Sequence, residues 1–307
     1  MSATLETREK PAAATAMSSD LTHEETFTRA AQTAGSGWSL WARQTLAILR
    51  LEIRKNFLGR RALLLYILAG LPLALLTLLA LFPPDADEFH NFPELSLIFS
   101  AVYNGLILRT LLFFGCAWVF MNLFRGEVVD RSLHYYFLTP VRREVLVVGK
   151  YLSGVVATVV LFGLTTVGSI AILYFWRHPS ESARYFFDGP GLGQAMTYLG
   201  ITALACVGYG AIFLIVGLFF RNPIIPALLF YGWEWINFLL PPVLKKVSVI
   251  HYLHSLVPVP MDDGPFAVLA EPTPAWVSVP SLFIFTALVL ALAGLHIRRM
   301  EISYAGE

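Results

Sequence analysis

Charged residues are scarce in this chain of 307 residues: only 14% are Asp, Glu, Lys or Arg, whereas 56% are hydrophobic. A soluble domain carries about 25% charged residues, so this composition excludes an ordinary water-soluble fold. Basic and acidic residues nearly cancel, leaving a net charge of +1, and no basic domain is present. Nucleic acid is therefore not expected as a partner.

Cysteine is almost absent, and both cysteines, Cys116 and Cys206, lie in apolar stretches. They cannot form the disulfide framework of a secreted domain, so we expect core or lipid-facing thiols.

The first 39 residues lack the apolar core of a secretory signal peptide. Residues 1–37 are expected to form a disordered cytoplasmic tail, and residues 301–307 a second, short one.

Long apolar runs are what the sequence has in abundance. About 20 helical residues cross a hydrocarbon core roughly 30 Å thick. We therefore predict an all-α integral membrane protein with six transmembrane helices in one domain, residues 38–300. The predicted spans are residues 62–82, 95–124, 145–175, 196–220, 223–240 and 279–297.

The basic residues that flank these runs are unequally divided, and the side richer in Lys and Arg is normally cytoplasmic. Fourteen fall on one side: Arg43, Arg50, Arg54, Lys55, Arg60, Arg61, Arg125, Arg131, Arg142, Arg143, Lys150, Arg221, Arg298 and Arg299. Four fall on the other: Arg177, Arg184, Lys245 and Lys246. This predicts a multi-pass protein of the plasma (inner) membrane with both termini in the cytoplasm.

Residues 38–61, before the first span, have the pattern of a basic amphipathic helix. Apolar side chains recur every three or four residues, at Leu46, Leu49, Ile53 and Phe57, with basic residues between them. Such a helix lies in the membrane interface with its cations near anionic headgroups. A cytoplasmic extension of the first span is the alternative.

Residues 241–278, before the last span, form a long segment rich in proline. We expect an exterior helical or re-entrant segment that packs on the mouth of the bundle. Two histidines in it, His251 and His254, could share a helix face, with Asp262 and Asp263 downstream. No fixed third ligand is evident, so no metal site is predicted.

A polar island at residues 125–144 separates the second and third spans. Its charged residues, with the lysine that follows, are Glu127, Asp130, Arg131, Arg142, Arg143, Glu144 and Lys150. A charged, helix-forming linker of this size lies at a membrane surface, where a soluble partner can contact it. An ordinary interfacial loop held by Tyr135 and Tyr136 is the alternative.

The linker and the predicted topology together resemble the membrane subunit of ABC-2-type ABC transporters. The residues that carry the resemblance are Glu127, Ser132-Leu133, Leu138, Pro140, Arg142-Arg143-Glu144 and Gly149-Lys150. They are similar to a family pattern of an acidic residue, Thr/Ser-Leu, Leu, Pro, an Arg/Glu pair and Gly-Lys. The resemblance covers about residues 38–300, and Arg131-Ser132 replaces the commoner Gly-Thr.

The resemblance implies a permease that forms an export path as a dimer, with an identical or a different second subunit. It also implies a coupling helix that contacts a cytoplasmic ABC ATPase. The implied contact residues are Glu127, Arg131, Ser132, Leu133, Tyr136, Phe137, Leu138, Pro140, Arg142 and Arg143. Lipids, drugs, glycans or peptides are the implied substrate classes.

The chain itself contains no ATP-binding motif. Gly149-Lys150-Tyr151 lacks both the upstream glycine and the hydroxyl residue of a P-loop. ATP and Mg are therefore expected on a separate partner subunit, and no cofactor and no enzymatic activity on this chain.

Besides Lys150 near the start of the third span, two charged residues lie inside predicted spans. Arg109 is near the middle of the second span, so it should face protein or water. It either lines a substrate path that attracts an anionic headgroup or sugar acid, or it is a structural partner. Glu234 in the fifth span is the possible counter-charge. Counting from the outer helix ends predicts an axial offset of roughly 12 Å between the two, which does not favour pairing.

Small residues line one stripe of the fourth span, at Ala203, Gly210 and Gly217. Such a stripe permits close helix packing, either within one subunit or at a dimer seam.

Other functional classes fit the sequence less well. A secondary transporter normally shows repeated halves and ion-coupling carboxylates, and neither is evident. An intramembrane enzyme needs converging catalytic groups, and there is no H-E-x-x-H motif or paired aspartate, so no catalytic residue is predicted. A membrane scaffold subunit remains a further alternative.

Overall fold

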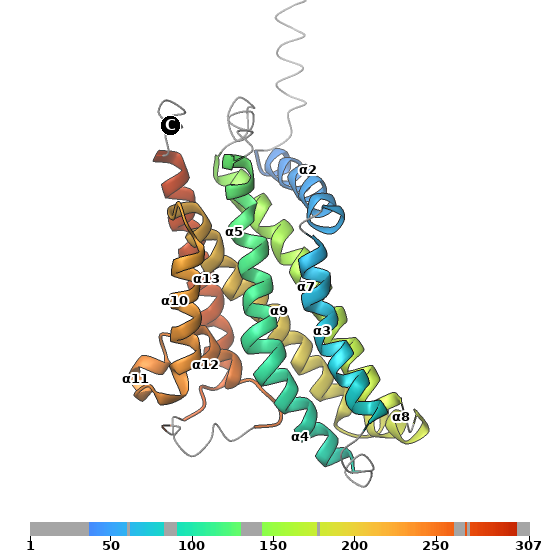
Figure 1. Cartoon of the computed structure of the whole chain (residues 1–307). Coiled ribbons are helices and arrows are strands. Elements are labelled where there is room, and N and C mark those ends of the chain that lie inside the picture. The colour runs from blue at the N-terminus through green and yellow to red at the C-terminus, as the bar shows by residue number, and fades with distance from the viewer. Residues whose placement is uncertain are drawn as a thin grey trace, which may run out of the picture.

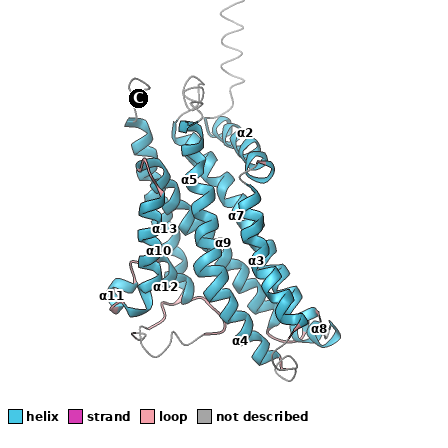
Figure 2. Ribbon diagram, viewed as in Figure 1, coloured by secondary structure: helices cyan, strands magenta, loops and turns pink. Residues whose placement is uncertain are grey.

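The computed structural model describes residues 37–59, 62–82, 91–129, 143–176, 179–260, 268 and 271–299. Within these ranges the chain is all-helical and contains no strand (Figure 2). Five helical stretches are long and apolar enough to cross a membrane, which confirms the predicted class of an all-α membrane protein. They are α3 (Ala62–Leu81), the composite Phe92–Phe124, α7 (Arg143–Phe175), α9 (Gly191–Phe219) and α13 (Ala275–Arg299).

The composite span is made of three consecutive helical segments. The α-helix α4 (Phe92–Val102) passes into a π-helix, η2 (Tyr103–Leu112), and then into the α-helix α5 (Phe113–Val129). A π-helix is rare and is often found at functional sites because its wider turn displaces side chains from α-helical register. Arg109 lies in this π-helix.

The predicted span at residues 223–240 is the exception among the six. It consists of α10 (Ile224–Trp235), 12 residues long, and a 3₁₀ turn, η3 (Ile236–Leu239). At normal helical rises the two extend about 26 Å, less than a hydrocarbon core of roughly 30 Å. The helix is apolar but shorter than the five long stretches.

The N-terminal helix α2 (Gly37–Leu58) and the C-terminal end of α13 lie at the same end of the bundle (Figure 1). We call this the α2 end. Three short helices, α8 (Pro179–Phe187), α11 (Pro242–Lys245) and α12 (Val249–His254), lie toward the other end, the α8 end. Residues 241–260 are thus largely helical, and α12 packs against α9 and α13.

Helix α9 is the centre of the bundle and packs against α5, α7 and α13. The ring of Phe120 on α5 fits between two glycines. A Cβ atom on Gly154 of α7 would lie 2.7 Å from that ring, and one on Gly210 of α9 would lie 2.5 Å from it. The three helices can approach this closely only because both positions lack a side chain.

Gly217, one heptad after Gly210, lies equally close to α5. A Cβ atom there would be 2.7 Å from the backbone of Met121. The glycine stripe of α9 therefore serves packing within the chain, which decides between the two alternatives left open by the sequence. Gly200, on the same helix, has no atom within 4 Å of an added Cβ.

These two glycines give a matched pair of variants. Gly217→Ala is expected to cost about 1–3 kcal/mol, because the backbone of Met121 cannot move aside as a side chain could. Gly200→Ala should be neutral or stabilise by about 0.5–1 kcal/mol, since alanine is the better helix former. Thermal unfolding midpoints of the two variants in detergent measure the difference. Equal midpoints would show that the close approach of α5 and α9 is not fixed by Gly217.

Candidate functional site

The predicted coupling segment lies between α5 and α7 in the chain, and the last turn of α5 and the first turn of α7 lie at the α2 end (Figure 1). Most of its predicted ATPase contacts lie outside the described residues: Arg131, Ser132, Leu133, Tyr136, Phe137, Leu138, Pro140 and Arg142. Glu127 lies in the last turn of α5, and Arg143 begins α7. The structure therefore describes the two helices that flank the segment.

A buried ion pair lies where these two helices meet α2. The Lys150 ammonium, on α7, donates to Glu52 Oε1 of α2 at 2.8 Å and to the Leu123 carbonyl oxygen of α5 at 3.1 Å. Its Nζ also lies 5.4 Å from the centre of the Phe124 ring. Lys150 is 0% exposed and Glu52 only 2% exposed. One side chain thus connects three helices beside the coupling segment.

The residue before this lysine explains why α2 can reach it. A Cβ atom on Gly149 would lie 3.1 Å from the Ile48 side chain of α2. Ile48 and Glu52 are four residues apart and share one face of their helix. Ile48 therefore packs against Gly149, while Glu52 forms the ion pair with Lys150. The Gly-Lys pair of the family resemblance has a structural role in this chain.

Glu52 could not be named as the partner of Lys150 from the pattern of basic and apolar residues alone. That pattern predicts an interfacial helix and assigns no role to Glu52, the single acidic residue of α2. The position of Glu52 in the sequence does indicate a buried partner. Glu52 follows Ile48 by four residues and Leu49 by three, so it lies on the apolar stripe of α2. An acidic residue on that stripe predicts a basic partner.

A second polar cluster lies where α9, α10 and α12 meet. Glu234 of α10 is only 4% exposed. Its carboxylate accepts hydrogen bonds from the Tyr209 hydroxyl at 3.2 Å, the Val249 amide at 3.1 Å and the Ile250 amide at 2.9 Å. The two amides are in the first turn of α12, where helix geometry leaves N–H groups without partners. Glu234 thus caps α12 from a neighbouring helix.

Arg109 of η2 lies near the same cluster but is bonded differently. The side chain is partly buried, and its Nε has no hydrogen-bond partner. Over the described ranges no carboxylate lies within 4.0 Å of it, so the structure does not pair Arg109 with Glu234. Its charge still acts on the hydroxyl of Tyr209, the residue that donates to Glu234.

The two charged residues lie closer in depth than counting from helix ends predicts. Phe113, four residues after Arg109, packs on Phe230 and Tyr231 with ring centres 5.8 and 5.0 Å apart. Glu234 follows these aromatic residues by three and four positions. The offset of roughly 12 Å was wrong because it assumed that the span around Glu234 runs straight to residue 240 at the membrane surface.

The histidine pair does not form a metal site in the described part of the chain. No group of three metal-binding side chains occurs there, and Asp262 and Asp263 lie outside it. The His251 Nε2 lies 3.0 Å from the Thr273 hydroxyl. Burial, and then the charges of Lys245 and Lys246, lower the pKa of His251 and so favour the neutral ring.

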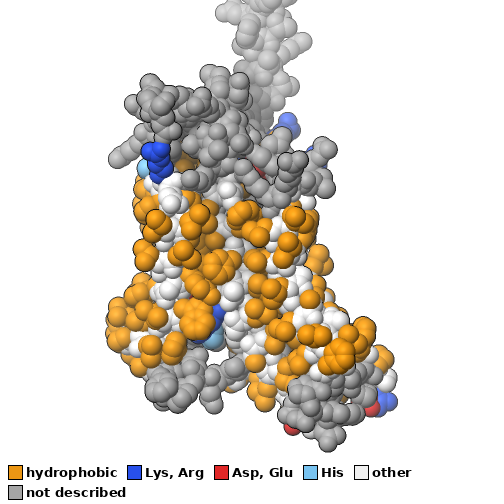
Figure 3. Space-filling model, viewed as in Figure 1, with side chains coloured by type: hydrophobic (Ala, Val, Ile, Leu, Met, Phe, Trp, Pro, Cys, Tyr) orange, Lys and Arg blue, Asp and Glu red, His pale blue; other side chains and the backbone are white. Residues whose placement is uncertain are grey.

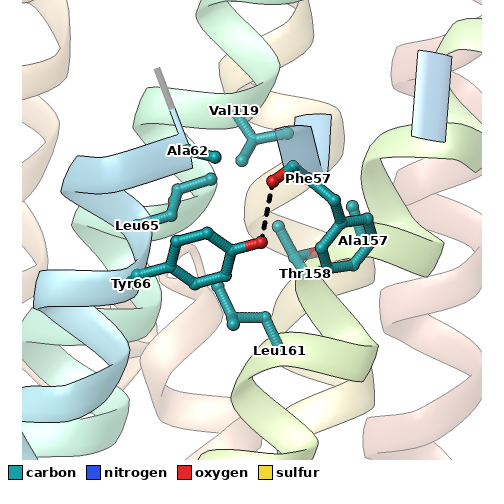
Figure 4. A pocket seen from close by; sticks show the side chains of 8 residues that line it. All are labelled: Phe57, Ala62, Leu65, Tyr66, Val119, Ala157, Thr158 and Leu161. Carbon is teal, nitrogen blue, oxygen red and sulfur yellow. Dashed lines mark hydrogen bonds between the residues drawn. The ribbon is translucent and has the colours of Figure 1, made fainter. Parts of the chain in front are cut away.

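A hollow opens between α2, α3, α5 and α7. Its lining is almost entirely apolar, and the Tyr66 hydroxyl donates to the Phe57 carbonyl oxygen at 2.8 Å (Figure 4). Thr158 and Tyr66 are the polar side chains of this lining, and each donates its hydroxyl to a backbone carbonyl oxygen.

No protein-family model, no curated protein and no solved structure matches this chain.

The ion pair predicts a specific pattern of stabilities. Glu52→Leu or Lys150→Met alone should destabilise the fold by about 3–5 kcal/mol, because each leaves a buried charge without its partner. The double variant Glu52→Leu with Lys150→Met should recover most of this loss, since neither charge remains. Thermal unfolding of these three variants and of the unsubstituted protein forms a double-mutant cycle. Additive losses in the double variant would contradict the pairing.

The cap on α12 is tested by hydrogen exchange. Glu234→Ala removes three hydrogen bonds, so amide exchange over residues 249–254 should rise at least tenfold, in line with a loss of about 1–3 kcal/mol. Glu181→Ala, at an exposed acidic residue of α8, is the control and should leave this segment unchanged. Unchanged exchange in Glu234→Ala would show that α12 is held by its apolar contacts alone.

Proposed function

We propose that this chain is the membrane-spanning permease subunit of an ATP-driven ABC exporter of the ABC-2 type. The observation that carries the proposal is the junction around Lys150, in which α2 is held against the two helices that flank the coupling segment. In this proposal the α2 end faces the cytoplasm of a plasma (inner) membrane, and both termini lie there.

The junction suits the transmission of movement. The coupling segment is covalently joined to α5 and to α7, and the Lys150 ammonium bonds to both α5 and α2. A displacement of the segment by an ATPase would therefore move the three helices together, as a rigid body. Without the ion pair, α2 could slide over α7 and the displacement would be partly lost.

The proposed topology has six crossings, with α10 and η3 as the fifth. A helix shorter than the bilayer is tolerated where neighbouring protein covers its end or the bilayer thins locally. Here α11 and α12 follow directly and lie nearer to the α2 end than the start of α4 does (Figure 1). These short helices are proposed to fill the outer mouth of the bundle.

Two such subunits, identical or different, would form the translocation path, and each would bind one cytoplasmic ABC ATPase that carries ATP and Mg. The chain itself supplies no catalytic group in this proposal. Membrane lipids would contact the exposed leucines of α3, among them Leu63, Leu71, Leu75 and Leu78.

Co-purification with the ATPase tests this function. Leu133→Asp and Phe137→Asp place a charge in the apolar part of the coupling segment, and each should abolish association with the ATPase. Asn222→Asp adds the same charge to the exposed turn between α9 and α10, at the same end of the bundle, and should leave association intact. If both coupling variants still bind the ATPase, the coupling segment is not the element on which the ATPase docks.

A further inference from the structure

We propose that Arg109 forms an anion-binding site at mid-depth in the membrane, and that the exported substrate is an amphiphile with a phosphate or carboxylate headgroup. The substrate role rests on the function proposed above. The anion-binding property of the chain does not, because it follows from the surroundings of Arg109 alone.

The first observation is a positive charge without compensation. A basic side chain near the middle of a span costs at least about 2.5–3.5 kcal/mol, so its charge is normally balanced. Arg109 lacks a carboxylate partner in the segments that the structure describes, and its Nε has no acceptor. The compensating negative charge must then come from outside these segments.

The second observation is that Glu234, the acidic residue nearest in depth to Arg109 among those described, already accepts hydrogen bonds from other groups. Glu234 accepts three hydrogen bonds from Tyr209, Val249 and Ile250, and these occupy both of its carboxylate oxygens. Turning it toward Arg109 would leave two amides of α12 without acceptors inside the bundle, at about 1–3 kcal/mol each. The remaining acidic side chains of known surroundings, such as Glu94, Glu144 and Glu181, lie at the ends of spans or in α8.

The third observation is space beside the guanidinium. Gly105 lies one turn before Arg109 in the π-helix, is exposed, and would have no atom within 4 Å of an added Cβ. The four-residue spacing of Gly105 and Arg109 is close to one turn of a π-helix, so the two residues lie on the same side of it. Arg109 itself remains partly exposed. A ligand can therefore reach the guanidinium from this face.

The chemistry of the site favours an anionic headgroup attached to an apolar body. A guanidinium binds phosphate and carboxylate oxygens through two parallel hydrogen bonds, which lysine cannot reproduce. Helix α10 exposes Leu228 and Leu229, and the following turn η3 exposes Ile236. These side chains suit acyl or other apolar groups. On the face shown in Figure 3, hydrophobic side chains cover most of the bundle between its two ends.

Lipid binding by the purified full-length chain in detergent tests the site, with no ATPase present. The probes are short-chain phosphatidylglycerol, a carboxylate amphiphile with chains of the same length, and zwitterionic phosphatidylcholine. The intact protein should bind one or both anionic probes at least tenfold more tightly than phosphatidylcholine. Which of the two binds more tightly identifies the headgroup as phosphate or carboxylate.

Three variants make the result specific. Arg109→Gln should abolish the tenfold preference, and Arg109→Lys, which keeps the charge but not the bidentate geometry, should retain part of it. Arg184→Gln, at an exposed arginine of α8, should retain all of it. Thermal unfolding of each variant confirms that it is folded. Equal binding of all three probes, or an unchanged preference in a folded Arg109→Gln protein, would overturn the proposal.

The outcome separates this inference from the proposed function. Leu133→Asp should lose the ATPase while keeping the preference for anionic lipid. If no ATPase associates with the intact chain but the preference depends on Arg109, the anion site stands and the transport function fails. If the ATPase associates and Arg109→Gln leaves the preference unchanged, the transport function stands and the anion site fails.

Discussion

The Lys150 ammonium is the group on which the arrangement at the α2 end depends. It is fully buried at the meeting point of three helices, and a buried ammonium is tolerated only when its charge and its donors are matched. Glu52 supplies the charge and the Leu123 carbonyl a further acceptor. Because each partner comes from a different helix, the requirement of one side chain fixes the relative position of α2, α5 and α7.

The need to match a buried charge also explains the contrast between Lys150 and Arg109. Lys150 is paired with Glu52 of α2, whereas Glu234, the acid in the span next to Arg109, is bonded to other groups. In the function proposed above, the first arrangement is a rigid joint that transmits force. In the same proposal, the second arrangement leaves the Arg109 charge available to bind a ligand.

Much of the fold could be predicted from the sequence. Hydropathy located the spans at residues 62–82 and 145–175 almost to the residue, because each is a continuous apolar run between charged residues. The order of the five long helical stretches has the same basis. The partner of Lys150 could not be predicted, since it depends on which face of α2 meets α7. The depth of Glu234 was misjudged because helix counting assumes a straight, complete crossing.

The short length of α10 is connected with the role of Glu234. A helix that ends before the membrane surface exposes its last carbonyl groups and the following backbone, and lipid offers these groups no hydrogen bonds. Here the chain turns through η3 and α11 into α12, whose first amides need acceptors at that depth. Glu234, one residue before the end of α10, supplies the acceptors from within the same segment. Because Glu234 supplies these acceptors, its carboxylate is not available to Arg109.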